Sequence, residues 1–280
     1  MKLSIITINR NNAAGLEKTM LSVASQTCKD FEYIVVDGAS TDDSVEVIKR
    51  LAPQFGERLK WISEPDKGIY NAMNKGMRMS AGEYFQILNS ADCLASDDVT
   101  ERMLAELEKQ GNPLMLYGNM IKCFSNGKKI LDKSFAGRPI TMIGMYTGTL
   151  NHNPTYIHSS LFDKYGYYDE TLKIVSDWKW FLQSIILYGE KPVYADINVT
   201  LFDMNGVSET NKDLNKAERK TVLEQLFPAT ILIDYEKYAF PIDQFNRLNR
   251  HPWAYKMVLF LERCLFKIEK YRNKRKNRVE

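Results

Sequence analysis

The fold is decided at residues 83–92, Glu-Tyr-Phe-Gln-Ile-Leu-Asn-Ser-Ala-Asp, where a strand-like apolar run leads into a polar tetrapeptide. In open α/β sheets, ligands bind in the crevice outside the carboxyl ends of the strands. Asn89 and Asp92 would lie at that edge, and a carboxylate there suits a divalent metal ion. The alternative is a simple turn, which Asn and Asp often form. The tetrapeptide alone favours the turn, so its role depends on the rest of the chain.

Strand-like and helix-like patterns alternate ahead of this stretch. Short β-branched apolar runs predict strands, and apolar residues at helical spacing predict the helices between them. The expected strands are 3–8, 31–36, 59–62 and 83–88. The expected helices are 14–26, a helix capped by Thr41 and Asp42 that carries Val45, Ile48 and Leu51, and 67–81, the last ended by a C-cap glycine at Gly82. Strands separated by helices imply right-handed parallel crossovers. The predicted fold class is therefore α/β, with a Rossmann-like, mainly parallel central sheet flanked by helices.

Composition is that of a soluble globular protein. The chain has 280 residues, of which 44% are hydrophobic and 26% charged, enough for a large core. The four cysteines form no C-x-x-C pair, which argues against a zinc site or a disulfide framework. The apolar run at residues 3–8 is too short for a signal peptide or a spanning helix. A cytoplasmic location is expected.

The chain lacks the glycine-rich phosphate loops of common nucleotide-binding sheets. No G-x-G-x-x-G follows the first strand, and no G-x-x-x-x-G-K-[ST] occurs in the sequence. A divalent metal ion that bridges a diphosphate to a carboxylate would serve instead, and Asp92 is the candidate ligand. Further polar residues follow the first two strands, namely Thr7, Asn9, Asp37 and Ser40. They converge with Asp92 if these strands are adjacent.

Four ordered motifs in the first third of the chain carry a resemblance to a known family. They are Thr-Ile-Asn-Arg-Asn at 7–11, Val-Asp-Gly-Ala-Ser-Thr-Asp at 36–42, Ser-Glu-Pro-Asp-Lys-Gly-Ile-Tyr at 63–70 and Leu-Asn-Ser-Ala-Asp at 88–92. In order and spacing they resemble the family 2 glycosyltransferases, which have the GT-A fold. The resemblance implies an inverting enzyme that uses a nucleotide sugar.

The resemblance also implies roles for individual residues. The position of Asp37 binds the base of the nucleotide, with help from Thr7, and the last Asp of a D-x-D type motif, here Asp92, holds Mn²⁺ or Mg²⁺ on the diphosphate. The donor-site residues assigned on this basis are Thr7, Asn9, Asp37, Asp66, Asn74, Asn89, Asp92 and His152. The chain departs from the family pattern at Gly38, where many members have a second Asp, and at Asn89 or Ser90, where an early Asp is common.

The second half of the chain should supply the catalytic base. Residues 115–123 and 129–132 flank a turn at 125–128 and predict a hairpin. His152, the turn at 166–170 and Ser176-Asp177 then match the family's later pattern, which gives Asp177 the role of base. The alternative is that Asp177 caps the helix that follows it. A helix N-terminus that keeps an Asp anionic is also a workable place for a general base.

Three segments are expected. Residues 1–210 form the GT-A domain, with a nucleotide-sugar half at 1–112 and an acceptor half at 113–210, and residues 211–280 form a helical extension with a basic tail. A loop at 205–208 resembles the family's flexible loop after the base. Residues 267–280 carry seven basic and two acidic side chains, so this tail has a net charge of +5 and the rest of the chain −2. A basic amphipathic helix over 255–280 is typical of the surface of an anionic membrane, here the inner face, and the alternative is a core-packed helix with a solvated tail.

The expected reaction is inverting transfer of a sugar, from a UDP-sugar by preference, to a hydroxyl of a glycan or of a lipid-linked sugar in surface polysaccharide biosynthesis. Asp177 would take the proton, and the metal held by Asp92 would stabilise the leaving diphosphate. One alternative is a degenerate nucleotide-sugar-binding module. Another is a sugar nucleotidyltransferase, which would need a glycine-rich, basic loop after the first strand. No motif indicates binding of nucleic acid.

Overall fold

The computed structural model describes residues 1–204 and 211–276, and side chains up to Tyr271. The described residues form a nine-stranded sheet in the order β3-β2-β1-β4-β8-β6-β9-β5, with β7 paired to β6. The first four strands in the chain are β1 (Leu3–Asn9), β2 (Phe31–Asp37), β3 (Leu59–Ser63) and β4 (Tyr84–Ile87). Their pairings are all parallel, and β1 lies between β2 and β4. The predicted convergence of three strand ends is therefore confirmed.

The second half of the chain extends the sheet with mixed directions. Its strands are β5 (Cys93–Leu94), β6 (Met115–Cys123), β7 (Lys129–Asp132), β8 (Thr155–His158) and β9 (Val193–Asp203). Strand β8 is antiparallel to both β4 and β6, so β6 and its parallel partner β9 run in the direction of β4. The predicted hairpin is β6–β7, and Gly127 in its turn has a φ of 79°. The sheet is mainly parallel, as predicted.

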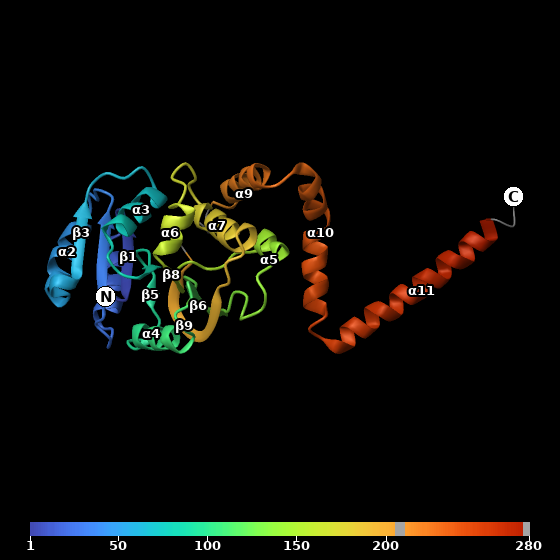
Figure 1. The fold of residues 1–280 in the computed structure, drawn as a ribbon, viewed down its shortest axis with the longest axis horizontal. Coiled ribbons are helices and arrows are strands. Elements are labelled where there is room, and N and C mark those ends of the chain that lie inside the picture. The colour runs from blue at the N-terminus through green and yellow to red at the C-terminus, as the bar shows by residue number, and fades with distance from the viewer. Residues whose placement is uncertain (205–210, 277–280) are drawn as a thin grey trace.

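Helices cover both faces of this sheet (Figure 1). The helices up to residue 187 are α1 (Ala13–Ala24), α2 (Ser44–Leu51), α3 (Ile69–Met79), α4 (Val99–Lys109), α5 (Met142–Thr147), α6 (Ser160–Tyr165) and α7 (Ser176–Phe181), the last continued by a π-helical turn at Leu182–Leu187. Alternate residues of β1 belong to two separate cores. Ile5 belongs to the core that contains residues of α1, α2 and α4, and Ile6 belongs to the core that contains residues of α3 and α7. Burial on both faces explains the continuous apolar strands.

Gly82 does not end a helix, which corrects the prediction from sequence. The C-cap of α3 is Ser80, in an extended conformation. Gly82 instead lies against β1, where its N–H donates to Ser4 Oγ at 2.9 Å. A Cβ at this position would lie 2.7 Å from the Ser4 backbone nitrogen, so the close approach of the two backbones requires a glycine.

Three helices follow the sheet: α9 (Lys212–Leu226), α10 (Ala229–Leu248) and α11 (Pro252–Lys276). Two residues of α9, Val222 and Leu223, are buried in the same core as α3 and α7, so α9 is packed into the domain that was expected to end at residue 210. Helix α10 lies against α5, and α11 projects away from the body (Figure 1). None of the described helices is long and apolar enough to cross a membrane. The loop at 205–208 lies outside the described residues.

Candidate active site

A cavity of about 840 Å³ opens at the carboxyl ends of β1 and β4, within the size range of small-molecule sites. One wall comes from the strand ends and the starts of α1 and α3. The opposite wall comes from the segment before β8, the start of α7 and one side of α9. Six of the residues predicted from sequence line it, namely Asn9, Asp66, Asn89, Asp92, His152 and Asp177. The cavity therefore gathers both proposed functional carboxylates, Asp92 and Asp177.

Asp37 lies beside this cavity and is fully buried. Its Oδ1 accepts hydrogen bonds from Asn9 Nδ2 (2.9 Å) and Ser40 Oγ (2.5 Å), and its Oδ2 from Ser40 N (2.9 Å) and Ser63 Oγ (2.7 Å). Burial alone would raise the pKa of Asp37, but these donors outweigh it and the pKa lies below its usual value. The carboxylate thus stays charged with four donors already bound, about its full capacity. Contact with a nucleotide base remains a prediction.

Two predicted donor contacts, Thr7 and Asn74, do not line the cavity. The Thr7 hydroxyl donates to the Leu88 carbonyl at 2.7 Å and accepts from Tyr33 Oη at 2.9 Å, inside the sheet. Asn74 holds the second half of the chain: it donates to Tyr168 O and Glu170 Oε1, both at 2.8 Å, and accepts from Tyr168 N at 3.1 Å. These polar atoms already have partners inside the protein, and a contact of either residue with the donor remains a prediction.

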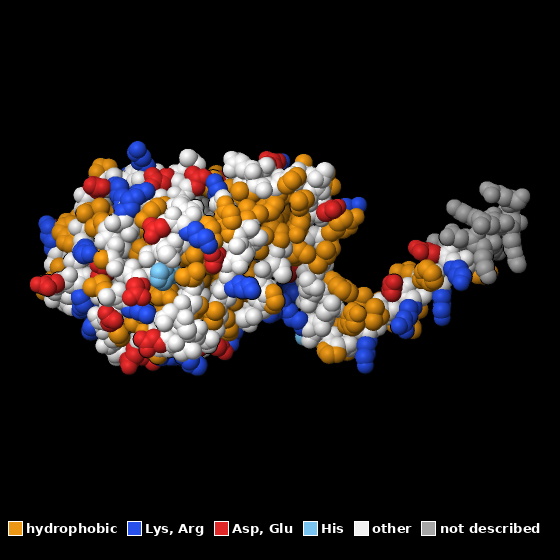
Figure 2. Space-filling view, viewed as in Figure 1, with side chains coloured by type: hydrophobic (Ala, Val, Ile, Leu, Met, Phe, Trp, Pro, Cys, Tyr) orange, Lys and Arg blue, Asp and Glu red, His pale blue; other side chains and the backbone are white. Residues whose placement is uncertain are grey.

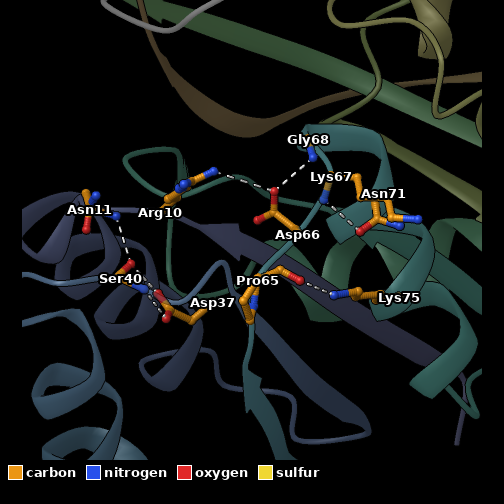
Figure 3. A network of polar contacts seen from close by, with 10 residues as sticks. All are labelled: Arg10, Asn11, Asp37, Ser40, Pro65, Asp66, Lys67, Gly68, Asn71 and Lys75. Carbon is orange, nitrogen blue, oxygen red and sulfur yellow. Dashed lines mark hydrogen bonds and ion pairs between the residues drawn. The ribbon is translucent and has the colours of Figure 1, made fainter.

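The departure at Gly38 has a structural counterpart in Asp66. A Cβ at residue 38 would lie 2.1 Å from Asp66 Oδ2, so the Asp66 carboxylate fills the space that a side chain there would need. Asp66 accepts from Gly68 N at 2.9 Å and lies 4.0 Å from Arg10 Nη1 (Figure 3). A second carboxylate is therefore present near Asp37 but is supplied by the loop after β3.

The tetrapeptide after β4 forms a turn and also presents its carboxylate to the cavity. Its backbone is held from α1: Thr19 Oγ1 donates to Asp92 O at 2.7 Å and accepts from Ala91 N at 3.0 Å. The Asp92 side chain accepts from Asn153 Nδ2 (3.1 Å) and Asp203 N (3.0 Å). Burial raises its pKa to about 7, against these bonds and the nearby His152. The turn predicted from the sequence is therefore present, and a metal ion at Asp92 stays a prediction.

The residues around Asp92 fit a divalent cation. Among the described residues no group of three or more His, Cys, Asp and Glu side chains could enclose a metal. Asn89 Oδ1, however, is buried without a hydrogen-bond partner in the described part of the chain, and it lines the cavity with the 3% exposed Asp92. Two oxygen donors suit Mg²⁺ or Mn²⁺ when a ligand's phosphates and water supply the remaining positions.

Asp177 sits at the second position of α7 and does not act as its N-cap, which is Val175. The Asp177 carboxylate lies 2.7 Å from Tyr70 Oη and 3.1 Å from His152 Nδ1. Burial alone would raise the pKa of Asp177, but the hydrogen bond and charge of His152 and the bond from Tyr70 lower it. Burial alone would lower the pKa of His152, but the neighbouring Asp177 carboxylate raises it above its usual value. The pair keeps an anionic carboxylate on the cavity wall, which is what a general base requires.

Three residues of the site were not singled out from sequence: Tyr70, Asn153 and Arg219. Tyr70 ended a quoted motif and Asn153 follows His152, so their neighbours carried a signal. Arg219 lies on α9, in the expected extension, and had no signal because its contacts are with residues about 40 to 70 positions away. Of the predicted residues, His152 was assigned to the donor, and its Nδ1 lies 3.1 Å from the carboxylate of Asp177, the predicted catalytic base.

Comparison with known sequences gives a consistent result. Residues 4–167 match the family described as glycosyl transferase family 2. A PGL/p-HBAD biosynthesis glycosyltransferase of Mycobacterium bovis is 32% identical over 179 residues, which cover 62% of this chain and 66% of the relative, just under two thirds of its length. An uncharacterised glycosyltransferase of Mycobacterium tuberculosis is 32% identical over 209 residues, 73% of this chain and 76% of the relative.

Similar folds are found among solved structures. S. aureus TarS (1–349) in complex with UDP-GlcNAc has a TM-score of 0.62 at 19% identity, over 75% of this chain and 61% of that one. The mannosyltransferase PcManGT from Pyrobaculum calidifontis, in complex with GDP-Man and Mn²⁺, has a TM-score of 0.56 at 16% identity, over 72% of this chain and 56% of that one. At these identities the likeness concerns the fold, and the predicted GT-A fold class is confirmed.

Proposed function

The chain belongs to glycosyltransferase family 2, and from this premise we propose that it transfers a sugar, with inversion, from a nucleoside-diphosphate sugar to an acceptor hydroxyl. One observation carries the proposal: the Asp177 carboxylate lines a cavity that also contains the buried carboxylate Asp92. Asp177 is partly buried, and its bonds to His152 and Tyr70 favour the anionic form. Asp177 is suited to take a proton and Asp92 to bind a cation. This division matches what transfer from a nucleotide sugar requires.

The proposed donor is a UDP-sugar and the proposed acceptor a glycan or a lipid-linked sugar in surface polysaccharide synthesis. The TarS structures are complexes with UDP and with UDP-GlcNAc, which supports a uridine nucleotide as the donor's carrier, whereas the PcManGT structure is a complex with GDP-Man. A relative named for PGL/p-HBAD biosynthesis supports an acceptor attached to a larger molecule. Asn9, Asp37 and Asp66 would position the base and ribose end of the donor, since they lie together at the ends of β1 to β3.

Asp92, with Asn89 Oδ1, would hold Mn²⁺ or Mg²⁺. When bound, the metal ion neutralises charge on the diphosphate as it leaves. Asn153 and the backbone N–H of Asp203 fix the Asp92 carboxylate in the cavity. The chain therefore orients the leaving group at the β4 wall, away from the start of α7 that carries the base.

Asp177 would remove the proton from the acceptor hydroxyl as the oxygen of that hydroxyl attacks the anomeric carbon. His152 holds Oδ2 and Tyr70 holds Oδ1, so the carboxylate has one fixed orientation. The Tyr70 hydroxyl has one hydrogen, and it can instead donate to the Ile174 carbonyl oxygen, which lies 2.6 Å from Tyr70 Oη. Such a shift would free Oδ1 to receive the proton.

The proposal is tested by thermal melting with a panel of UDP-, GDP- and TDP-sugars, each with and without Mn²⁺, followed by turnover of the donor that stabilises most. A donor at 100 times its dissociation constant should raise the free energy of unfolding by about 2.7 kcal/mol. Stabilisation without turnover on any acceptor would indicate a binding module. Pyrophosphate-dependent formation of a nucleotide sugar would indicate a nucleotidyltransferase, and no stabilisation by any donor would reject the proposal.

We propose in addition that α11 binds the surface of an anionic bilayer. Its apolar side chains recur at helical spacing and are exposed, with Trp253 at 68% and Phe260 at 65%, so the core-packed alternative is not observed (Figure 2). The exposed apolar residues on one face are Trp253, Met257, Phe260, Leu261, Leu265, Ile268 and Tyr271, and the basic ones along one flank are Lys256, Arg263, Lys267 and Lys270. Tyr255 and Phe266 are also exposed but lie outside this face. An apolar face bordered by basic residues suits anionic headgroups.

Vesicle flotation tests this second proposal. Changing Lys256, Arg263, Lys267 and Lys270 together to Gln should weaken binding to vesicles of phosphatidylglycerol and phosphatidylcholine, because each basic residue near such a surface contributes about 1 kcal/mol. Binding to vesicles of phosphatidylcholine alone should be weak for both forms. Equal flotation of wild type and variant on anionic vesicles, or concentration-dependent dimers that involve α11 in place of flotation, would reject it.

A further inference from the structure

Helix α9 is fixed directly beside the proposed base. Glu218 on this helix accepts hydrogen bonds from the backbone nitrogens of Lys173 (2.8 Å) and Ile174 (2.9 Å), in the segment that leads into α7. Val222 and Leu223, one turn later, are buried in the core. These contacts determine where the next residue after Glu218, Arg219, can lie, and it lines the cavity.

Arg219 brings a partly desolvated positive charge to this wall. Its Nη1 donates to the Gly148 carbonyl at 3.0 Å, and its guanidinium lies 4.5 Å from the centre of the Trp178 ring. Its Nε is buried with no hydrogen-bond partner among the described residues. Burial lowers the pKa of Arg219, against the charge of Asp177. The group remains charged because an Arg side chain does not lose its proton in proteins.

Four other Lys and Arg side chains line the cavity, and two of them have a carboxylate partner. Arg10 lies 4.0 Å from Asp66 and Lys122 lies 2.8 Å from Asp132, whereas Lys18, like Arg219, has no ion pair among the described residues. Within residues 1–204 and 211–276 no carboxylate lies within 4.0 Å of the guanidinium of Arg219 or the ammonium of Lys173, which also lines the cavity. Lys173 is exposed, but Arg219 is partly buried. Taking the Arg219 cation partly out of water without a partner destabilises the protein, whereas a bound anion would restore the balance.

We infer that Arg219 and Lys173 form a subsite for a phosphate group carried by the acceptor, beside the base Asp177. A guanidinium presents a planar fork of N–H donors that matches phosphate oxygens, and within the described part of the chain Arg219 donates through Nη1 to Gly148 while its Nε has no partner. The subsite lies on the acceptor side because Arg219 packs on Trp178, the residue after Asp177, whereas the donor residues lie at the strand ends. The inference rests on the proposed function, since Asp177 marks the acceptor only if it is the base.

A small phosphate ester tests the subsite without knowledge of the natural acceptor. Glycerol 3-phosphate, with glycerol as the neutral match, is titrated into the full chain at constant ionic strength and followed by NMR, with saturating UDP and Mg²⁺ to occupy the donor site. The wild type should bind glycerol 3-phosphate saturably and glycerol not at all. Arg219→Gln should weaken binding of the phosphate ester by roughly 10- to 100-fold, the range for loss of a hydrogen bond to a charged group. Arg219→Lys should weaken binding less. Arg102→Gln, on the surface of α4, is the matched control.

The outcomes separate this inference from the function on which it rests. No binding of UDP with Mg²⁺ to the wild type would reject the proposed donor. Binding of UDP with no preference for the phosphate ester over glycerol, or an Arg219→Gln variant that loses UDP affinity and keeps the ester, would reject the acceptor subsite alone. If Arg219→Gln melts below the assay temperature, Lys173→Gln gives the second measurement, because its backbone contact with Glu218 is retained. Unchanged ester affinity in that variant would also count against the subsite.

Discussion

Two regions of the same sheet edge use Asp residues in opposite ways. One is the Asp37 network, which consists of Asp37 with Asn9, Ser40 and Ser63, and the other is the cavity with Asp92 and Asp177. Asp37 has four donors, and its pKa is low despite complete burial. Asp92, at the end of a strand two positions away in the sheet, has two donors, and its pKa is raised to about 7. A strand-end carboxylate therefore has no fixed role. The Asp37 carboxylate has its full set of donors within the protein, whereas the Asp92 carboxylate has two donors and lines the cavity.

Asp177 shows a third arrangement within the cavity. Asp177 has two side-chain partners, Tyr70 and His152. These partners favour the charged form of the carboxylate although it is partly buried. The His152 Nε2 has no hydrogen-bond partner among the described residues. We therefore expect substitutions in the cavity to affect function more than stability, whereas substitutions in the Asp37 network should also lower stability.

The largest effect is expected for Asp177→Asn. Asn keeps the shape of the side chain and can accept a hydrogen bond from Tyr70, but it cannot take up a proton at neutral pH. Turnover should fall by roughly 10²- to 10⁴-fold, the usual contribution of a general base. Steady-state kinetics and a thermal melt of the same preparation give the measurement, and the melting temperature should stay close to that of the wild type.

Asp169→Asn is the matched control for this variant. Asp169 is also paired, with Lys179 at 2.6 Å, but it does not line the cavity. Its replacement should leave turnover within a few-fold of the wild type. The assignment of the base to Asp177 would be wrong if the two variants lost activity equally, or if Asp177→Asn stayed active and Asp169→Asn did not.

The next effect is on stability, from Asp37→Asn. An amide cannot accept from all four donors, so the free energy of unfolding at neutral pH should fall by about 1–3 kcal/mol. The pKa of Asp37 is lowered in the folded state, so its contribution is present above its unfolded value of about 3.8 and is lost as the pH falls through the folded value. The difference between wild type and variant in denaturant unfolding should therefore shrink below pH 4. A difference that is constant or grows on acidification would contradict the low pKa.

A smaller effect is expected from Asn74→Ala, which removes contacts between neutral groups for the most part. The free energy of unfolding should fall by about 1–2 kcal/mol because Asn74 joins α3 to the turn at 168–170. The affinity for UDP with Mn²⁺ should not change, since Asn74 does not line the cavity. A loss of nucleotide affinity with unchanged stability would support the role in donor binding that the sequence predicted.

The accuracy of the sequence analysis follows the range of the interactions involved. Strands and helices up to residue 88 were predicted because their apolar periodicity is local, and the adjacency of β2, β1 and β4 follows from crossover geometry. Thr7 and Asn74 are held by Leu88 and Tyr168, which lie 81 and 94 positions away in the sequence. The periodicity of apolar residues gives no information about contacts at such a separation. The contact of His152 with Asp177 and the place of Arg219 depend on the packing of α7 and α9 and were missed for the same reason.

The central claim is that Asp92 holds a divalent cation that in turn holds a nucleoside diphosphate. Calorimetric titration of UDP into wild type and Asp92→Asn, each with and without Mn²⁺, tests it most directly. We predict that Mn²⁺ strengthens UDP binding to the wild type by at least about 10-fold, the lower end of the loss seen when metal sites are perturbed, and that this gain disappears in the variant. Equal dependence on Mn²⁺ in both proteins, or no binding of UDP under any of the four conditions, would contradict the claim.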